Sequence, residues 1–298
     1  MTTIYCAPLI SVVIPTLNRT DLLENAISSV EAQTYKNIEI IVVDDFSSKE
    51  IPVERFIEKF KSVKLVFIRN TKRMGGAASR NIGIDKSRGD FICFLDDDDV
   101  YMPNKIKLLL DAINKSPDAD AAFGKIRVHN GSNYINCFNE IKRFNIHENI
   151  MLMNMIHNNA TLIRRDILNK VKFLESLTRY QDLQFNIELS LKSKIIYVNE
   201  FVAEWRVDNR QDKITHNGDS VKNKKDVVAF LMVYKYLRSR LSVPTKILVL
   251  FKLKSIKMLL MTGQYFDALK ILFSDGSIFN IFNVLYALRL RKAYWTIS

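Results

Sequence analysis

Four consecutive aspartates, Asp96 to Asp99, follow directly on the apolar residues 91–95 in the stretch FICFLDDDDVYMPNK. Adjacent carboxylates repel one another, and two such charges at about 4 Å cost about 1 kcal/mol in water. A run of this kind is typical of one of two structures. It is either a solvated acidic turn or a site for a hard cation, because Mg²⁺ and Mn²⁺ prefer carboxylate oxygens as ligands.

Polar residues also follow two earlier apolar segments. Thr16 and Asn18 come directly after residues 9–15, LISVVIP, and the pair Asp44–Asp45 ends residues 38–45, IEIIVVDD. Taken alone, the aspartate pair is more typical of a turn or a helix cap than of a binding site. The interpretation therefore depends on whether the fold brings these groups together.

The hydrophobic pattern predicts strands that alternate with helices, and these elements would position the polar groups. Continuous apolar runs predict buried strands at residues 9–15, 38–45, 64–70 and 90–97. Apolar residues at helical spacing predict helices at residues 22–30, 52–60, 77–87 and 103–113. Such alternation predicts an α/β fold, Rossmann-like, with a mostly parallel sheet flanked by helices.

In an open parallel sheet, ligands bind beyond the carboxyl ends of the strands, so the three polar groups are expected to converge there. One pair of acids can bind a base or ribose, and the other cluster can hold a divalent cation and, through it, a diphosphate. Residues 71–76, TKRMGG, and Arg80 add positive charge nearby, without a Walker-type motif. These residues predict an enzyme for a metal-bound nucleoside diphosphate.

Charge is concentrated at the C-terminal end of the 298-residue chain, whose formal net charge is +12. From Lys222 onward, fourteen Lys or Arg stand against three Asp. The asymmetry and the polar residues 208–225 predict two domains, 1–220 catalytic and 221–298 a basic helical extension.

The basic extension interleaves lysines with large apolar residues, as in KILVLFKLKSIKMLLM. Its longest charge-free run, residues 276–288, is too short to span a bilayer. Basic amphipathic helices suit an anionic membrane surface, and packing on the catalytic domain or an oligomer contact are the alternatives. No nucleic-acid-binding motif is recognisable.

Cysteine and histidine usage excludes some classes of site. The three cysteines, Cys6, Cys93 and Cys137, form no framework, and four scattered histidines do not favour zinc. No basic leader precedes the first apolar run, which is predicted to be a strand and not a signal peptide. A reduced, cytoplasmic setting is expected.

The order and spacing of four segments resemble the family 2 glycosyltransferases of GT-A fold. The segments are SVVIPTLNR, IEIIVVDDFS, NTKRMGGAASRNIGIDKSRGDFICFLDDDD and YMPNKI, within about the first 115 residues. Weaker likeness continues through HNNATLIRRDIL, TRYQDLQFNIEL and VNEFVAEWRVD. The resemblance implies an enzyme that moves a sugar from a nucleoside diphosphate to an acceptor hydroxyl, usually with inversion.

The resemblance also implies roles for individual residues. Asp96 and Asp98 match the family's Asp-X-Asp motif, which holds Mn²⁺ or Mg²⁺, while Asp99 could instead cap the following helix. Asp44 and Asp45 fall where the family contacts the nucleotide. The full set expected to bind the nucleotide-sugar donor is Thr16, Asn18, Asp44, Asp45, Arg80, Asp96 and Asp97.

The catalytic base implied by the resemblance is Asp182. The family usually has Glu-Asp at this point, where the aspartate deprotonates the acceptor, whereas this chain has Gln181-Asp182. The usual preceding Gly-Gly is also absent, since the chain reads VKFLESL. Asp182 could in addition be the N-cap of a helix over residues 183–191.

The combined expectation is an inverting, metal-dependent glycosyltransferase that uses UDP-sugars. Its expected acceptor is a lipid-linked saccharide at the inner face of the cell membrane, in surface polysaccharide assembly. Two alternatives remain open at this point. A sugar nucleotidyltransferase shares the α/β plan but normally has a Gly-rich basic loop where this chain reads PTLNRTD. A non-catalytic nucleotide-sugar-binding module would have no use for Asp182.

Overall fold

The structure is a computed structural model that describes residues 7–129, 134–136, 156–206, 224–240 and 245–273. The chain forms two compact units. The first comprises Met1–Ser176 and Gln181–Arg210, and the second comprises Leu177–Tyr180 and Gln211–Ser298. The predicted domain boundary at residue 220 stays a prediction, because residues 207–223 lie outside the described residues.

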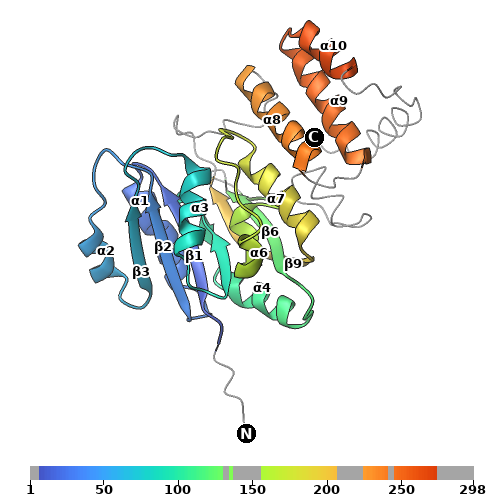
Figure 1. The fold of residues 1–298 in the computed structure, drawn as a ribbon. Helices are drawn as coiled ribbons and strands as arrows, with labels where there is room; N and C mark the ends of the chain where they lie inside the picture. The colour runs from blue at the N-terminus through green and yellow to red at the C-terminus, as the bar shows by residue number, and fades with distance from the viewer. Residues whose placement is uncertain (1–6, 130–133, 137–155, 207–223, 241–244, 274–298) are drawn as a thin grey trace. The chain divides into compact units, whose positions relative to one another are not determined.

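The first unit contains a sheet of nine strands in the order β3-β2-β1-β4-β8-β6-β9-β5, with β7 paired to β6 (Figure 1). The strands are β1 Ile10–Thr16, β2 Ile38–Asp44, β3 Lys64–Arg69, β4 Phe91–Phe94, β5 Val100–Tyr101, β6 Ala121–His129, β7 Tyr134–Asn136, β8 Thr161–Arg164 and β9 Ile195–Arg206. The helices are α1 Thr20–Glu31, α2 Val53–Lys59, α3 Gly76–Lys86, α4 Lys105–Asn114, the 3₁₀ turn η1 Asn158–Ala160, α6 Arg165–Leu168 and α7 Gln181–Lys192.

The strands predicted from the first apolar runs form the parallel part of this sheet. β1 pairs in parallel with both β2 and β4, and β2 pairs in parallel with β3. Beyond β4 the sheet is mixed, because β8 runs antiparallel between β4 and β6, and β6 pairs in parallel with β9. The predicted α/β class is confirmed, and all four predicted N-terminal helices are present as α1 to α4.

Helices cover both faces of the sheet, so the strands are buried on both sides (Figure 1). Successive residues of a strand point to opposite faces. Val12 and Ile14 of β1 therefore pack in one cluster with α1, α2 and α4, whereas Val13 packs in the other with α3, α6 and α7. This arrangement explains why the strands are continuous apolar runs and not alternating ones.

Helix α3 lies unusually close to β1 because of a glycine. A Cβ atom added at Gly83 would lie 2.2 Å from Cγ1 of Val13, a distance that real side chains do not tolerate. Since α3 carries Arg80 and β1 ends at Thr16, this contact sets the position of two residues expected at the site.

A buried carboxylate ties together the opposite, amino end of the sheet. Glu39 on β2 is 1% exposed, and its Oε1 accepts hydrogen bonds from the Ser11 hydroxyl at 2.7 Å and the Arg88 N–H at 2.7 Å. Lys64 Nζ lies 3.1 Å from Oε2. Burial works to raise the pKa of Glu39, but these hydrogen bonds and Lys64 outweigh it, and the pKa lies below its ordinary value.

Glu39→Gln should lower the free energy of unfolding by about 1.5–3 kcal/mol at neutral pH, because a hydrogen-bonded buried charge is replaced by an amide. A carboxyl whose pKa is depressed on folding stabilises above its unfolded pKa and loses that contribution as pH falls through its folded pKa. The gap between wild type and variant should therefore close in acid. Urea unfolding from pH 7 to pH 3 measures this, with the exposed Glu54→Gln as control. A difference in the free energy of unfolding between wild type and variant that does not depend on pH would contradict this prediction.

The residues of the second unit that the structure describes include three helices, α8 Lys224–Arg240, α9 Thr245–Met261 and α10 Tyr265–Phe273, in agreement with the predicted helical C-terminal extension. The rings of Phe230 and Phe251 stack 5.2 Å apart to join α8 and α9. The lysines of α9 do not share one exposed face, because Lys252 is buried while Lys254 and Lys257 are exposed. None of the helices in the described parts of the chain is both long enough and apolar enough to cross a membrane.

Candidate active site

The loops after β1 and β2 are fastened to each other by Asn18. Its backbone N–H donates to the Ser47 hydroxyl at 2.8 Å, and its Oδ1 accepts from the Ser48 N–H at 2.7 Å. Asn18 and Phe46 both adopt positive φ, at 56° and 67°. Non-glycine residues are rarely held in this region except where surrounding structure imposes it, often near functional sites. The predicted donor residue Asn18 thus shapes the loop at the carboxyl edge of the sheet.

The two aspartates at the end of β2 have different partners. The Asp44 carboxylate accepts from the Ser47 N–H at 2.9 Å and pairs with Arg69 at 3.2 Å. Asp45 accepts from the backbone N–H groups of Met74 at 2.7 Å and Gly75 at 2.8 Å. Asp45 therefore holds the start of α3 in place, a role that the sequence reading did not include.

The four aspartates alternate between accessible and enclosed. The side chains of Asp96 and Asp98 are 27% and 15% exposed, whereas that of Asp97 is 6% exposed and the residue Asp99 is 2% exposed. The turn after β4 therefore directs alternate carboxylates outward. The outward pair is the one that matches the Asp-X-Asp spacing.

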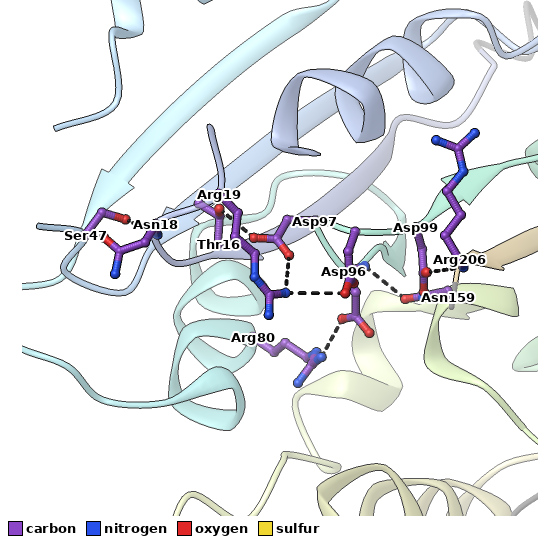
Figure 2. Close-up of polar contacts among 11 residues, drawn as sticks. Thr16, Asn18, Arg19, Ser47, Arg80, Asp96, Asp97, Asp99, Asn159 and Arg206 are labelled. Atoms are coloured by element: carbon purple, nitrogen blue, oxygen red, sulfur yellow. Dashed lines mark hydrogen bonds and ion pairs between the residues drawn. The ribbon is translucent and has the colours of Figure 1, made fainter. Parts of the chain in front are cut away.

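The enclosed carboxylates hold the turn in place (Figure 2). Asp97 accepts from the Thr16 hydroxyl at 2.8 Å, and Arg19 Nη1 lies 3.1 Å from its Oδ1. Burial raises the pKa of Asp97 to about 6, although Arg19 and Thr16 favour its ionised form. Asp99 accepts from the side-chain amide of Asn159 and from the Arg206 N–H.

The suggested cap role of Asp99 is wrong. Helix α4 begins at Lys105, and its N-cap residue is Asn104. Asp99 instead joins the aspartate turn to η1 and β9, because the cost of its burial is offset by donors from both elements.

Arg80 connects Asp96, one of the two outward aspartates, with the expected base. Its Nη2 lies 2.5 Å from Asp96 Oδ1 (Figure 2). Its guanidinium lies over the Phe173 ring, 5.5 Å from the ring centre. Burial works to raise the pKa of Asp96, but Arg80 outweighs it and the pKa lies below normal. The same positive charge acts on Asp182. The Arg80 guanidinium thus interacts electrostatically with the carboxylates of both Asp96 and Asp182.

Asp182 lies in the first turn of α7, where the helix dipole favours a negative charge. The Asn158 amide donates to its Oδ1 at 2.6 Å. Burial raises the pKa of Asp182, Arg80 lowers it, and Asp96 raises it further, with a net upward shift. A raised pKa places a carboxylate closer to the range in which it can accept a proton from a hydroxyl.

Three buried polar atoms around Asp96 and Asp182 have no hydrogen-bond partner among the residues that the structure describes: Arg80 Nε, His157 Nδ1 and Asn158 Oδ1. A buried polar atom left unpaired costs about 1–3 kcal/mol. Orphan atoms of this kind suit a site that a polar ligand completes. Asn158 and Asn159 lie in the segment HNNATLIRRDIL. In this segment, polar residues directly precede an apolar run, and that pattern is the sequence signal that could have identified them as site residues.

The donor set fits a hard divalent cation. Asp96 and Asp98 offer only carboxylate oxygens to solvent, which Mg²⁺ and Mn²⁺ prefer. Among the described residues, no group of three or more His, Cys, Asp or Glu could hold a metal by itself. In phosphate-binding sites, such cations are usually bound by one or two carboxylates together with phosphate oxygens of the substrate.

The structure brings most of the predicted site residues to one edge. Thr16, Arg80 and Asp182 lie around the aspartate turn. Asp44 and Asp45 lie at the end of strand β2, where Asp44 is linked through Ser47 to Asn18 and the Asp45 N–H donates to the Thr16 carbonyl. Sequence reasoning missed Arg19 and Asn159. Their partners among the four aspartates are 60 to 79 residues distant along the chain, so only the fold reveals the contacts.

Known proteins resemble this chain in sequence and in fold. It is 26% identical to the amylovoran biosynthesis glycosyltransferase AmsB of Erwinia amylovora, over 71% of this chain and 74% of the relative. It is 37% identical to the GalNAc(5)-diNAcBac-PP-undecaprenol beta-1,3-glucosyltransferase of Campylobacter jejuni, over 36% of this chain and 35% of the relative. S. aureus TarS 1-349 in complex with UDP-GlcNAc superposes with a TM-score of 0.66 at 17% identity, over 85% of this chain and 73% of that one, which shows the fold alone.

The sequence model of Glycosyl transferase family 2 matches residues 11–171, more than half of the chain. This match contains the aspartate turn, Arg80 and Asn158, and it overturns both the nucleotidyltransferase and the non-catalytic alternatives. The protein therefore belongs to glycosyltransferase family 2 and is a glycosyltransferase of GT-A fold.

Proposed function

We propose that this glycosyltransferase uses a nucleoside diphosphate sugar, with UDP as the nucleotide, and inverts the anomeric configuration. The observation that carries the proposal is the guanidinium of Arg80, which pairs with Asp96 and acts on Asp182. The carboxylate expected near the donor's diphosphate and the carboxylate expected at the acceptor thus share one partner. The UDP-GlcNAc complex of TarS supports the choice of nucleotide.

The residues divide the reaction between them. Asp96 and Asp98 would hold the divalent cation, whose chemistry when bound is to neutralise the diphosphate leaving group. Asp182 accepts the proton of the acceptor hydroxyl, whose oxygen attacks the anomeric carbon opposite the diphosphate. The bond from that carbon to the diphosphate oxygen breaks as the new bond forms, which inverts the configuration. Asn158 fixes one oxygen of Asp182 during this step.

A donor screen tests the proposal. Saturation binding of a panel of UDP-, GDP- and dTDP-sugars, with Mn²⁺ and with EDTA, should give one preferred UDP-sugar whose affinity depends on the cation. Released UDP should then report turnover. Tight binding of a GDP- or dTDP-sugar would correct the nucleotide, and affinity that is unchanged by EDTA would overturn the metal dependence.

The proposed acceptor is a lipid-linked saccharide of a surface polysaccharide, met at the cytoplasmic face of the membrane. The name of the Campylobacter jejuni relative includes a PP-undecaprenol acceptor, and that of AmsB includes amylovoran biosynthesis. In the second unit, Lys254 and Lys257 are exposed beside apolar residues, and Phe266 is 83% exposed. A basic surface with an exposed aromatic suits an anionic bilayer.

Replacing Lys254 and Lys257 together by Gln should weaken sedimentation with anionic vesicles, because each basic residue near such a surface contributes about 1 kcal/mol. Donor hydrolysis, a reaction of the first unit, should be unchanged. The matched control replaces the exposed Lys61 and Lys115 of the first unit by Gln. Equal sedimentation of the two double variants at low and high salt would contradict the membrane role of the second unit.

A further inference from the structure

Arg19 shares one nitrogen between two of the four aspartates. Its Nη1 lies 3.1 Å from Asp97 Oδ1 (Figure 2). The same nitrogen lies 3.4 Å from Asp98 Oδ2. Asp98 is one of the two outward carboxylates that the proposed function assigns to the divalent cation. In this structure a guanidinium therefore contacts the same oxygen-rich turn that the cation would use.

The two arginines at the turn are held differently. Arg80 lies on α3 with its side chain 11% exposed, stacked on Phe173 and 2.5 Å from Asp96. The Arg19 side chain is twice as exposed, at 22%, and its contacts with the aspartates are longer. Of the two guanidiniums, that of Arg19 is thus the more exposed and the one whose contacts with the aspartate turn are longer.

The backbone at Arg19 is fixed even though its side chain is partly exposed. The preceding residue, Asn18, is bonded to Ser47 and Ser48, and the Arg19 carbonyl accepts the Leu23 N–H at 2.9 Å at the start of α1. Any rearrangement is therefore confined to the rotatable bonds of the arginine side chain. The guanidinium can move without unfolding the loop that carries it.

We propose that Arg19 is the exchangeable counter-cation of the aspartate turn. It pairs with Asp97 and Asp98 before the donor binds, gives up Asp98 when the divalent cation enters, and then pairs with the diphosphate of the donor. The inference rests on the proposed donor and cation site, and it adds to that site a residue that recognises the diphosphate.

Elementary electrostatics favours such an exchange. A guanidinium and a divalent cation that share the Asp98 carboxylate repel each other, and the repulsion is stronger near a protein surface than in bulk water. A diphosphate brings negative charge to the same place, and arginine binds phosphate oxygens through two parallel hydrogen bonds. Arg19 therefore disfavours binding of the divalent cation alone and favours binding of the cation together with a nucleotide.

Opposite effects on two affinities are the signature of this exchange. Without nucleotide, Arg19→Gln should bind Mn²⁺ about 3- to 5-fold more tightly than wild type, because a competing ion pair is gone. At saturating Mn²⁺, the same variant should bind UDP about 10-fold more weakly, because a charged hydrogen-bond donor to phosphate is lost. Electron paramagnetic resonance of free Mn²⁺ measures the first affinity, and calorimetric titration with UDP measures the second.

Two further variants make the experiment decisive. Arg19→Lys keeps the charge but loses the planar fork, so its Mn²⁺ affinity should stay near wild type while its UDP affinity falls a few-fold. It carries the test if Arg19→Gln does not fold, as judged by thermal melting. The matched control is Arg55→Gln, which removes an exposed arginine that pairs with Glu24 on the surface. Both affinities of the control should equal those of wild type.

The outcomes separate this inference from the function on which it rests. If wild type binds Mn²⁺ and UDP, and Arg19→Gln changes neither affinity or lowers both, then Arg19 is an ordinary structural ion pair and the inference is overturned. If none of the proteins binds Mn²⁺ or UDP, the proposed donor site itself fails, and the inference fails with it.

Discussion

Asp182→Asn should lower the rate of sugar transfer by about 10²- to 10⁴-fold, the usual loss when a general base is removed. The amide has almost the same shape as the carboxylate, so α7 and its contact with Asn158 should persist. Donor affinity should stay near wild type, because the proton acceptor acts on the other substrate. Steady-state transfer with separate donor-binding measurements distinguishes the two effects.

The pH dependence of the wild-type reaction should identify the same residue. Burial raises the pKa of Asp182 above its ordinary value, and a base works only when deprotonated. The rate should therefore fall as pH drops through this raised pKa, at a higher pH than for an exposed aspartate. Asp182→Asn should abolish that acid limb. The matched control, Asp111→Asn, removes an exposed carboxylate on α4 and should keep the wild-type profile. If Asp182→Asn turns over at the wild-type rate, Asp182 is not the general base and is only an acidic residue in the first turn of α7.

Asp98→Asn should reduce turnover at least about tenfold, because a neutral amide replaces one of the two outward carboxylates proposed to hold the divalent cation. The Mn²⁺ concentration needed for half-maximal activity should rise, and excess Mn²⁺ should restore part of the rate. Titration of activity with Mn²⁺ in wild type and variant measures both effects.

The enclosed neighbour provides the comparison for Asp98. Asp97→Asn keeps the outward pair but weakens the contacts with Thr16 and Arg19, so it should affect stability more than the Mn²⁺ requirement. Unchanged activity and unchanged metal dependence in Asp98→Asn would remove the cation interpretation of the aspartate turn.

The sheet and its edge could be predicted because their signals are local. Residues 9–15 and 38–45 are apolar throughout, as strands buried on both faces must be, and the polar residues that follow them necessarily lie at the carboxyl edge. The alternation of Asp96 to Asp99 between outward and enclosed is likewise consistent with the spacing of the motif.

The partners within the site could not be predicted, because they depend on how distant segments pack. Asp45 reads as a ligand for the nucleotide, yet its carboxylate holds the backbone of Met74 and Gly75. Lys105 gives no sign in the sequence that it is fully buried, with its Nζ 3.4 Å from the centre of the Tyr101 ring. A pattern of charges specifies which side chains are polar, but only tertiary packing decides which of them stay in water, as Lys252 also illustrates.

The close contact of Gly83 with Val13 limits how this enzyme can be re-engineered. Because a Cβ atom at position 83 would clash with Val13, a larger residue there should displace α3 from β1. Arg80 lies three residues earlier on the same helix and should then move away from Asp96. A mutagenesis library that varies position 83 should therefore yield inactive variants. Their loss of activity would resemble that of a binding-site mutation, although Gly83 lies on the face of α3 that packs on β1. Libraries aimed at new donor sugars should keep this glycine constant and vary only side chains that face the ligand.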